Sequence, residues 1–201
     1  MSRPVARSSS SSGDEPGGGS HRDALRACGA PPAAEPGLLA YLDLLAAWSP
    51  RVNLTGARSP EERVRTLVAP VLPLESLVPE GRVVDLGSGN CSPGLVLALL
   101  RPTLDVTLVE PRMRRVAFLR EAARAAHRED VKVFRGRHDE YAGPLARTVV
   151  VRALTLPLHE LARLLEPGGL VLILGRPPAL APGFTEEPSP APDLHVYRRS
   201  T

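Results

Sequence analysis

Short apolar runs alternate with helix-forming segments through the middle of the chain. The runs at 83–86, 104–110, 131–134, 148–151 and 170–174 are predicted strands, because each is largely aliphatic or β-branched and ends at turn-forming residues. The segments 93–100, 112–127 and 158–165 are predicted helices. Strands that alternate with helices pair in parallel and are covered by helices on both faces. Residues 80–176 are therefore predicted to form a doubly wound, Rossmann-like α/β domain.

Two helices are predicted ahead of this domain. Residues 38–48 carry leucine and alanine at helical spacing, which indicates a first helix. Residues 61–77 indicate a second helix, which Pro70 and Pro73 must break or kink because proline cannot continue a regular helix. Together these segments predict an N-terminal helical cap over residues 37–79.

The two ends of the chain differ in composition from its middle. Residues 1–20 are rich in serine and glycine and almost free of apolar side chains. Such a segment buries too little apolar surface to offset the entropy lost on ordering, so residues 1–36 are predicted to be a disordered tail. Residues 177–192 are rich in proline and predict an extended linker, followed by one short final strand at 194–197.

Composition limits the kind of molecule this is. The chain of 201 residues has room for one mid-sized domain, and its core must be aliphatic because 43% of the residues are hydrophobic but only 3% are aromatic. The formal net charge is +3, and Lys132 is the one basic residue out of 25 that is not arginine. The arginine content reflects either coding bias or the binding of phosphates and base edges.

Neither a membrane span nor a metal site is expected. The chain contains no run of about 18 apolar residues and no apolar stretch near its start. Cys28 and Cys91 are far apart, and the five histidines show no metal-ligand spacing. We therefore expect a cytoplasmic protein without a metal, and a monomer.

A glycine-rich loop, DLGSGNCSPG at 85–94, follows the first predicted strand. Ligands of doubly wound sheets bind beyond the carboxyl ends of the strands, which is where this loop lies. A P-loop is excluded because no Gly-Lys-Ser/Thr follows. Two cofactor classes remain, a dinucleotide and S-adenosylmethionine.

Two acidic residues favour S-adenosylmethionine over a dinucleotide. Asp85 would repel a pyrophosphate, but it suits the ammonium and sulfonium charges of S-adenosylmethionine. Glu110 ends the second strand 23 residues after Gly87 and is placed to accept hydrogen bonds from both ribose hydroxyls. Asp85, Gly87, Gly89 and Glu110 are therefore predicted cofactor-binding residues. The alternative for Asp85 is that it only caps the turn that follows.

Further short motifs occur in a fixed order between residues 38 and 176. They are Trp48 with NLTG at 53–56, DLGSG at 85–89, Pro93-Gly94, Arg101-Pro102, RRVAFL at 114–119, Arg137 with Glu140, and Arg152-Ala153. With this set the chain resembles the bacterial small-subunit rRNA methyltransferase G family, also called RsmG or GidB. The resemblance implies an S-adenosylmethionine-dependent class I methyltransferase that methylates N7 of a guanine in 16S rRNA, either free or in the small ribosomal subunit.

The resemblance also implies functional residues. The positions that hold the cofactor in that family correspond to Gly87, Ser92, His138, Asp139 and Arg152 of this chain. Arg152 and Arg137 are the predicted catalytic residues, and they would act by positioning, because guanine N7 has a free lone pair and needs no general base. Arg152 would contact guanine O6 or the methionine carboxylate. The alternatives are a structural ion pair for Arg152 and a local surface pair with Glu140 for Arg137.

The chain departs from the family pattern at several positions. Cys91 replaces the third glycine of the loop, Ala69 replaces the aspartate of an Arg-His-x-x-Asp-Ser motif, and Leu174 replaces the lysine of a Lys-Gly pair. These departures leave two alternatives open, a catalytically impaired relative that binds cofactor or RNA, and a small-molecule methyltransferase on the same fold. Glycine adopts a left-handed backbone conformation without strain, whereas cysteine does not. Asparagine tolerates this conformation, so we expect Asn90 to adopt it in place of Cys91. The alternative is that the Cys91 sulfur intrudes on the cofactor.

Overall fold

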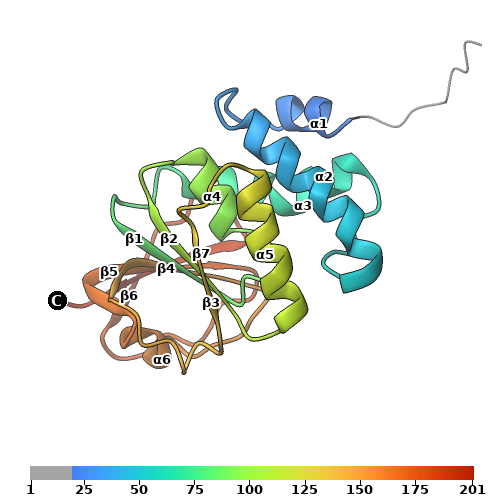
Figure 1. Cartoon of the computed structure of the whole chain (residues 1–201). Coiled ribbons are helices and arrows are strands. Elements are labelled where there is room, and N and C mark those ends of the chain that lie inside the picture. The colour runs from blue at the N-terminus through green and yellow to red at the C-terminus, as the bar shows by residue number, and fades with distance from the viewer. Residues whose placement is uncertain (1–19) are drawn as a thin grey trace, which may run out of the picture.

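The computed structural model describes residues 20–201, and a mixed sheet runs through the centre of this part of the chain (Figure 1). Its strands lie in the order β3-β2-β1-β4-β5-β7-β6. They are β1 (Arg82–Leu86), β2 (Asp105–Glu110), β3 (Lys132–Arg135), β4 (Ala146–Arg152), β5 (Leu165–Leu174), β6 (Phe184–Glu187) and β7 (Leu194–Arg199). Strands β1 to β5 are parallel, whereas β7 is antiparallel to both β5 and β6. The predicted doubly wound α/β fold is confirmed.

Side chains that alternate along the strands divide the core into two layers. In β1, Val83 packs into the layer beneath the cap, whereas Val84 and Leu86 pack into the opposite layer. In β4, Val150 belongs to the first layer and Val149 to the second. Because successive residues of a strand point to opposite faces, each central strand needs apolar residues at consecutive positions. This requirement explains the continuous apolar runs in the sequence.

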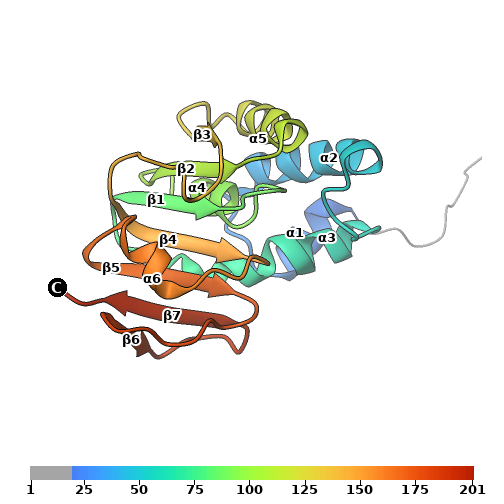
Figure 2. The same cartoon turned by 90° about the horizontal axis from the view of Figure 1, so that it is seen from below.

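Helices cover the two faces of the sheet unequally (Figure 2). They are α1 (His21–Ala27), α2 (Glu35–Val52), α3 (Pro60–Leu67), the 3-10 helix η1 (Ala69–Leu74), α4 (Gly94–Leu100), α5 (Met113–Ala125) and α6 (Leu158–Ala162). Helices α4 and α5 lie on one face with the cap formed by α1, α2 and α3, and α6 lies on the other face. The predicted interruption of the second cap helix is confirmed, since α3 ends before Pro70 and a 3-10 helix follows.

The cap is held on the sheet by the apolar face of α2. Leu38, Tyr41 and Leu45 recur at helical spacing along this helix and are fully buried. At its far end, the ring of Trp48 lies 5.7 Å from the ring of Phe118 in α5, measured between centroids. Burial of this stripe against α5 fixes the position of α2 over one end of the sheet.

The N-terminal prediction is wrong from residue 20 onward. Residues 1–19, which carry most of the predicted disordered tail, lie outside the described residues. Helix α1 begins at a capping box between Ser20 and Asp23. Leu25 of this helix is fully buried, and Glu35 of α2 forms ion pairs with arginines of α1. Tertiary contacts of α1, among them the buried Leu25, therefore order a segment that its local composition predicted to be disordered.

The predicted proline-rich linker is also wrong in part. Strand β6 lies within residues 177–192 and pairs with β7, which contains the predicted strand 194–197 and continues to Arg199. Phe184 anchors β6, since it is 6% exposed and packs in the core layer of α6. The prolines flank β6 and do not interrupt it, so the strand can form.

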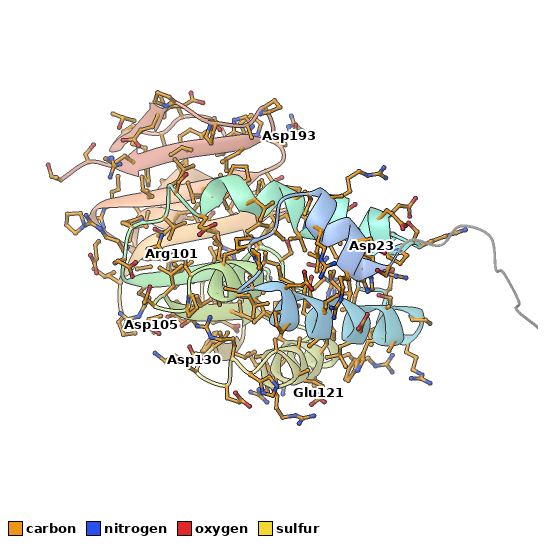
Figure 3. All side chains as sticks on the ribbon, turned by 90° about the horizontal axis from the view of Figure 1, so that it is seen from above. Asp23, Arg101, Asp105, Glu121, Asp130 and Asp193 are labelled. Atoms are coloured by element: carbon orange, nitrogen blue, oxygen red, sulfur yellow. The ribbon has the colours of Figure 1, made fainter. Side chains whose placement is uncertain are left out.

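Arg101, at the end of α4, ties the segment that precedes β1 to the rest of the fold (Figure 3). Its Nη1 atom donates hydrogen bonds to the carbonyl oxygens of Glu75 and Val78, at 2.9 and 3.2 Å. Carbonyl groups outside regular structure need donors from elsewhere, and a guanidinium is a strong one. Arg101 thereby fixes the turn between η1 and β1.

We expect Leu25→Ala to lower the free energy of unfolding by about 2–5 kcal/mol, because loss of a fully buried leucine side chain leaves a cavity. Leu180→Ala is the matched control, since Leu180 is 59% exposed and its change should stay within about 0.5 kcal/mol. Urea denaturation of both variants is the measurement. Equally small changes in the two variants would show that α1 is not part of the cooperative fold.

Candidate functional site

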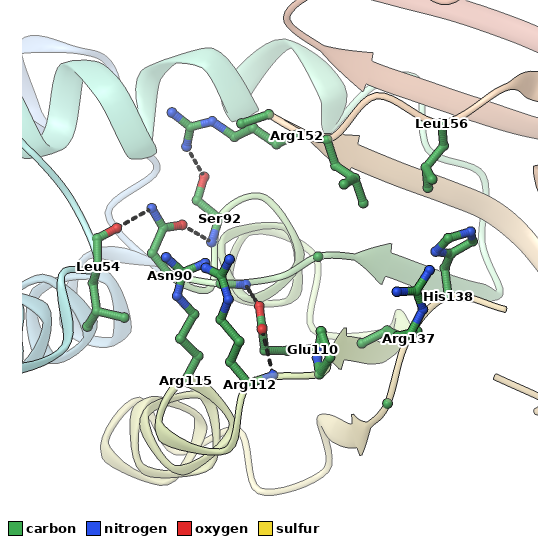
Figure 4. A pocket seen from close by; sticks show the side chains of 17 residues that line it. Leu54, Asn90, Ser92, Glu110, Arg112, Arg115, Arg137, His138, Arg152 and Leu156 are labelled. Atoms are coloured by element: carbon green, nitrogen blue, oxygen red, sulfur yellow. Dashed lines mark hydrogen bonds between the residues drawn. The ribbon is translucent and has the colours of Figure 1, made fainter. Parts of the chain in front are cut away.

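A pocket of about 580 Å³ opens at the carboxyl ends of β1, β2, β3 and β4 (Figure 4). Its wall combines the loop after β1, the end of β2 with the start of α5, the loop after β3, and the segment after β4. The predicted site residues that line it are Gly87, Gly89, Ser92, Glu110, Arg137, His138 and Arg152. Asp85 and Asp139 do not line it. The structure therefore brings together most of the residues that the sequence singled out.

Glu110 joins three of the segments that form the pocket. It ends β2 and is 3% exposed. Its Oε2 atom accepts a hydrogen bond from the Gly89 N–H at 3.1 Å, and its Oε1 atom accepts one from the Arg112 N–H at 2.9 Å. Each carboxylate oxygen can accept a second hydrogen bond. Glu110 thus keeps acceptor capacity on the side where it lines the pocket.

The loop after β1 is also tied to β2 through its backbone. The N–H groups of Gly87 and Ser88 both donate to the carbonyl oxygen of Val109, at 2.9 and 3.1 Å. The Ser88 hydroxyl in turn accepts a hydrogen bond from the Val109 N–H at 3.1 Å. Gly87 has a φ of +72°, which glycine adopts without strain. The chain therefore turns over the end of β2 directly after leaving β1.

Asp85 lies beneath this loop and does not line the pocket, and its contact with the cofactor stays a prediction. The residue is 1% exposed, and its Oδ2 atom accepts a hydrogen bond from the N–H of Gly94, the first residue of α4, at 3.0 Å. A Cβ at Gly94 would lie 2.6 Å from that oxygen, so the approach requires glycine. Asp85 fixes the start of α4, which agrees with the capping alternative. Burial raises the pKa of the Asp85 carboxyl to about 7.

Cys91, and not Asn90, adopts the left-handed conformation, so the expectation for Asn90 is wrong. The φ of Cys91 is +76°. Asn90 is held by other contacts, since its Nδ2 donates to the Leu54 carbonyl oxygen and its Oδ1 accepts from the Ser92 N–H, both at 3.2 Å. The Cys91 side chain is fully buried beneath the cap and does not line the pocket. Burial raises the pKa of its thiol well above the usual value.

The cap contributes directly to the geometry of the loop. The Tyr41 hydroxyl, on the buried face of α2, donates a hydrogen bond to the Asn90 carbonyl oxygen at 2.8 Å. The Ser92 hydroxyl donates to the carbonyl oxygen of Leu67, the last residue of α3, at 2.7 Å. Two cap helices therefore hold two nearby positions of the loop, and the loop's shape depends on the docked cap.

Arg152 reaches from the end of β4 to the same junction (Figure 4). Its Nη1 atom donates to the Ser92 hydroxyl oxygen at 2.9 Å, and its Nη2 atom donates to the Thr66 carbonyl oxygen of α3 at 2.6 Å. These partners are neutral oxygen atoms, so Arg152 is held by hydrogen bonds and not by the structural ion pair that was its alternative. Partial burial lowers the pKa of Arg152, and the group remains charged because a guanidinium does not lose its proton in proteins.

The loop after β3 places Arg137 and His138 on another side of the pocket (Figure 4). The Nε2 atom of His138 lies 2.9 Å from a carboxylate oxygen of Glu160 in α6. The side chain of Arg137 pairs with Asp139 at 3.1 Å, and both side chains are more than half exposed. Glu140 instead accepts a hydrogen bond from the Arg137 backbone N–H. Asp139 does not line the pocket, and its contact with the cofactor stays a prediction.

Two arginines of the pocket wall, Arg112 and Arg115, were missed by the sequence analysis. Arg112 precedes α5 and Arg115 lies in its first turn, and both side chains extend toward the loop after β1 (Figure 4). A signal for them exists in the sequence. Residues three apart share a helix face, and helical side chains lean toward the N-terminus, so basic residues that open the helix after β2 point to the carboxyl edge of the sheet.

Comparison with known proteins supplies the family. The model of the GidB family, described as rRNA small subunit methyltransferase G, matches residues 35–176. The chain belongs to this family. Ribosomal RNA small subunit methyltransferase G of Xanthomonas axonopodis pv. citri is 37% identical over 141 residues, which are 68% of this chain and 66% of that protein. The protein of the same name from Thermobifida fusca is 43% identical over 106 residues, 50% of this chain and 45% of that protein. The chain thus spans about half to two thirds of the length of these relatives.

Solved structures resemble this GidB-family chain at lower sequence identity. TrmN from Thermus thermophilus superposes with a TM-score of 0.55 at 23% identity, over 77% of this chain and 53% of that one. A mutant of MtNAS in complex with S-adenosylmethionine gives a TM-score of 0.56 at 16% identity, over 80% of this chain and 73% of that one. These likenesses concern the fold, which is the Rossmann-like methyltransferase fold.

Residues 20–201 contain neither a metal-binding cluster nor a membrane-spanning helix. No group of three or more His, Cys, Asp or Glu side chains in this range could hold a metal ion. No helix in the same range has the length and apolar character needed to cross a membrane.

We expect Tyr41→Phe to loosen the loop after β1. The substitution removes the hydroxyl that donates to the partly buried Asn90 carbonyl oxygen, so the free energy of unfolding should fall by about 0.5–1.5 kcal/mol and amide exchange at Cys91 and Ser92 should accelerate. Tyr197→Phe is the matched control, because Tyr197 is 1% exposed but lies on β7 in the opposite core layer. Hydrogen exchange of the loop measures the effect. The same loop exchange in both variants would contradict the role of Tyr41.

We expect Asp85→Asn to change how stability depends on pH. The carboxyl pKa is about 7 in the folded protein and near 3.8 in the unfolded chain, so between these pH values the folded state alone holds the proton. Wild-type stability therefore includes a contribution that falls as the pH rises from about 4 to about 7, by at most about 1.4 kcal/mol per pH unit. The variant keeps an acceptor for the Gly94 N–H but lacks this contribution.

Urea denaturation at a series of pH values from about 4 to about 8 measures the effect, as the stability difference between Asp85→Asn and wild type. The free energy of unfolding of Asp85→Asn, relative to that of wild type, should increase as the pH rises. Asp130→Asn is the control, because a hydrogen bond from Arg128 lowers the pKa of Asp130 and its contribution changes only at more acid pH. A flat difference for Asp85→Asn across this range would contradict a raised pKa at Asp85.

Proposed function

We propose that this chain is an S-adenosylmethionine-dependent methyltransferase that methylates N7 of a guanine in 16S rRNA, in the cytoplasm. Family membership supports the reaction class, since the relatives compared above are named as ribosomal RNA small subunit methyltransferases. The observation that carries the proposal is the pocket itself, where a buried carboxylate faces a glycine-rich loop and arginines line the wall.

The hydrogen-bond acceptors of the Glu110 carboxylate fit the cofactor. Both carboxylate oxygens are oriented by a backbone N–H and keep a lone pair, which matches the two adjacent hydroxyl donors of a ribose. The pocket volume of about 580 Å³ falls within the usual range for small-molecule sites, about 300–1,000 Å³. When bound, S-adenosylmethionine supplies a methyl group on a positively charged sulfur. Gly87, Gly89 and Ser92 would form the wall of its site.

Arginines in the wall favour RNA over a small neutral substrate. Arg112 and Arg137 are exposed, Arg115 and Arg152 are partly buried, and all four line the pocket. Guanidinium groups bind phosphates in a bidentate manner and attract polyanions. Around a methyl donor that is itself cationic, such a wall favours an anionic substrate. This supports rRNA over the small-molecule alternative.

The chemistry needs positioning and no proton transfer. The lone pair on guanine N7 forms the bond to the methyl carbon while the bond from carbon to sulfur breaks, and the electrons of the broken bond stay on sulfur. The products are 7-methylguanine, which gains the positive charge, and S-adenosylhomocysteine. No residue has to accept a proton. Arg152, fixed by Ser92 and Thr66, and Arg137 on another wall are placed to orient the reactants.

The departures from the family pattern leave the pocket open. Cys91 is fully buried beneath the cap and does not line the pocket. Ala69 lies in η1 and Leu174 ends β5, and neither lines the pocket. None of the three therefore blocks the space proposed for the cofactor, which favours an enzyme over the impaired relative.

We expect calorimetry to show S-adenosylmethionine binding that depends on Glu110. Glu110→Gln should weaken it about 5- to 150-fold, because a charged acceptor of hydrogen bonds is worth about 1–3 kcal/mol. Glu121→Gln is the matched control, since Glu121 lies on the surface of α5 and pairs with Arg124. Undiminished affinity in Glu110→Gln would contradict the ribose contact.

Turnover is tested on 16S rRNA and on small subunits from a strain that lacks its GidB-family protein. We expect incorporation of labelled methyl groups and 7-methylguanosine in the nucleoside digest. Cofactor binding without transfer would favour the impaired relative. Methylation at another atom, or of small molecules alone, would overturn the proposed reaction.

A further inference from the structure

Leu154 is a large apolar side chain that stays exposed in the pocket wall. It follows β4 and is 39% exposed. Among the described residues, the other exposed large apolar side chains are Met113, Leu145 and Leu180, and none of these lines the pocket. An exposed apolar group inside a ligand pocket is typical of a surface that a ligand covers.

The backbone and the loop hold Leu154 in place. Ala153, directly before it, has a φ of +53°, which is unfavourable for a residue other than glycine and is kept only when the surroundings impose it. Leu156, two residues on, is 7% exposed and packs in the core layer of α6. The Leu154 side chain lies over the loop after β1, since a Cβ at Gly87 would be 3.2 Å from its Cδ2 atom. Leu154 is therefore a fixed part of the wall.

The strand order assigns this part of the wall to the substrate. Across the pocket the strands follow one another as β3, β2, β1 and β4. Under the proposed function, Glu110 at the end of β2 holds the ribose, which places the adenosine over β2 and β3. The loop after β1 comes next, and Leu154 lies beyond it after β4. The methyl group must lie between the cofactor and its target, so the target base belongs on the β4 side.

A nucleobase taken out of its stack needs a flat apolar contact. His138 is the one aromatic ring in the lining, and it lies in the loop after β3, where its Nε2 atom is 2.9 Å from a carboxylate oxygen of Glu160. On the β4 side the apolar contact therefore has to come from an aliphatic group. We infer that Leu154 is the apolar wall against which the target guanine lies. This role rests on the proposed function and makes Leu154 a positioning residue for the base.

Leu154→Ala tests the inference, because its effect on cofactor affinity and its effect on kcat can be measured separately. We expect S-adenosylmethionine affinity to stay within about twofold of wild type, because the variant keeps Glu110 and its two backbone partners, which hold the cofactor over β2 under the proposed function. The kcat on undermethylated 16S rRNA should fall about tenfold or more, with KM little changed, because phosphate contacts dominate RNA affinity. Leu154→Met should recover most of the rate. Leu145→Ala is the matched control, since Leu145 is 43% exposed and lies outside the pocket.

A second readout needs no turnover. Leu154→Trp places an indole where the base is expected, and stacking on guanine quenches indole fluorescence. We expect undermethylated 16S rRNA to quench this variant, loaded with S-adenosylhomocysteine, at least twice as strongly as Leu145→Trp. The intrinsic Trp48 is common to both proteins and is subtracted with wild type.

The outcomes separate this inference from the proposed function. Equal kcat in Leu154→Ala and Leu145→Ala, or equal quenching in the two tryptophan variants, overturns the role of Leu154 while wild-type turnover leaves the proposed function intact. A fivefold or larger loss of cofactor affinity in Leu154→Ala assigns the wall to the cofactor and also overturns the inference. A wild-type protein that binds cofactor but modifies no rRNA overturns the proposed function and the inference with it.

Discussion

A buried carboxylate bonded to two backbone N–H groups sets the geometry of the functional edge of this molecule. The Gly89 N–H comes from the loop after β1 and the Arg112 N–H from the start of α5, and Glu110 at the end of β2 accepts both. An ionised group without partners would be costly to bury, and hydrogen bonds to an ionised acceptor are stronger than those between neutral groups. Loop and helix are therefore held at a fixed separation. The width of the pocket follows from that separation.

The cap belongs to the site as much as the sheet does. Tyr41 holds the loop backbone at Asn90, and the end of α3 holds both the Ser92 hydroxyl and the Arg152 guanidinium. Arg152 thus connects β4, the loop and the cap through hydrogen bonds to neutral oxygen atoms. A boundary drawn near residue 80 marks a change of sequence pattern, but these contacts cross it. The pocket geometry is therefore a property of cap and sheet together.

Much of this arrangement could be predicted because parallel strands carry continuous apolar runs and present their ligands at one edge. The burial of Asp85 has a signal in β1: Asp85 is two residues from Val83, so it points into the same core layer, and it does not line the pocket. Helix α1 and strand β6 were missed because they depend on tertiary packing of side chains such as Leu25 and Phe184, and local composition does not record such packing. The backbone of Cys91 could not be predicted either, since contacts to Asn90 from distant segments determine it.

The position of β7 has a consequence for the order in which the sheet assembles. Strand β7 lies between β5 and β6, so β6 finds its only sheet partner in β7 within residues 20–201. Strand β6 can therefore join the sheet together with β7 or after it, but never before it. Opening of this edge follows the reverse order, so β6 leaves before β7 or together with it, and the ion pair between Arg198 and Glu187 is lost only when β6 leaves alone. Strand β5 separates this edge from β1 to β4, so such opening leaves the pocket strands paired.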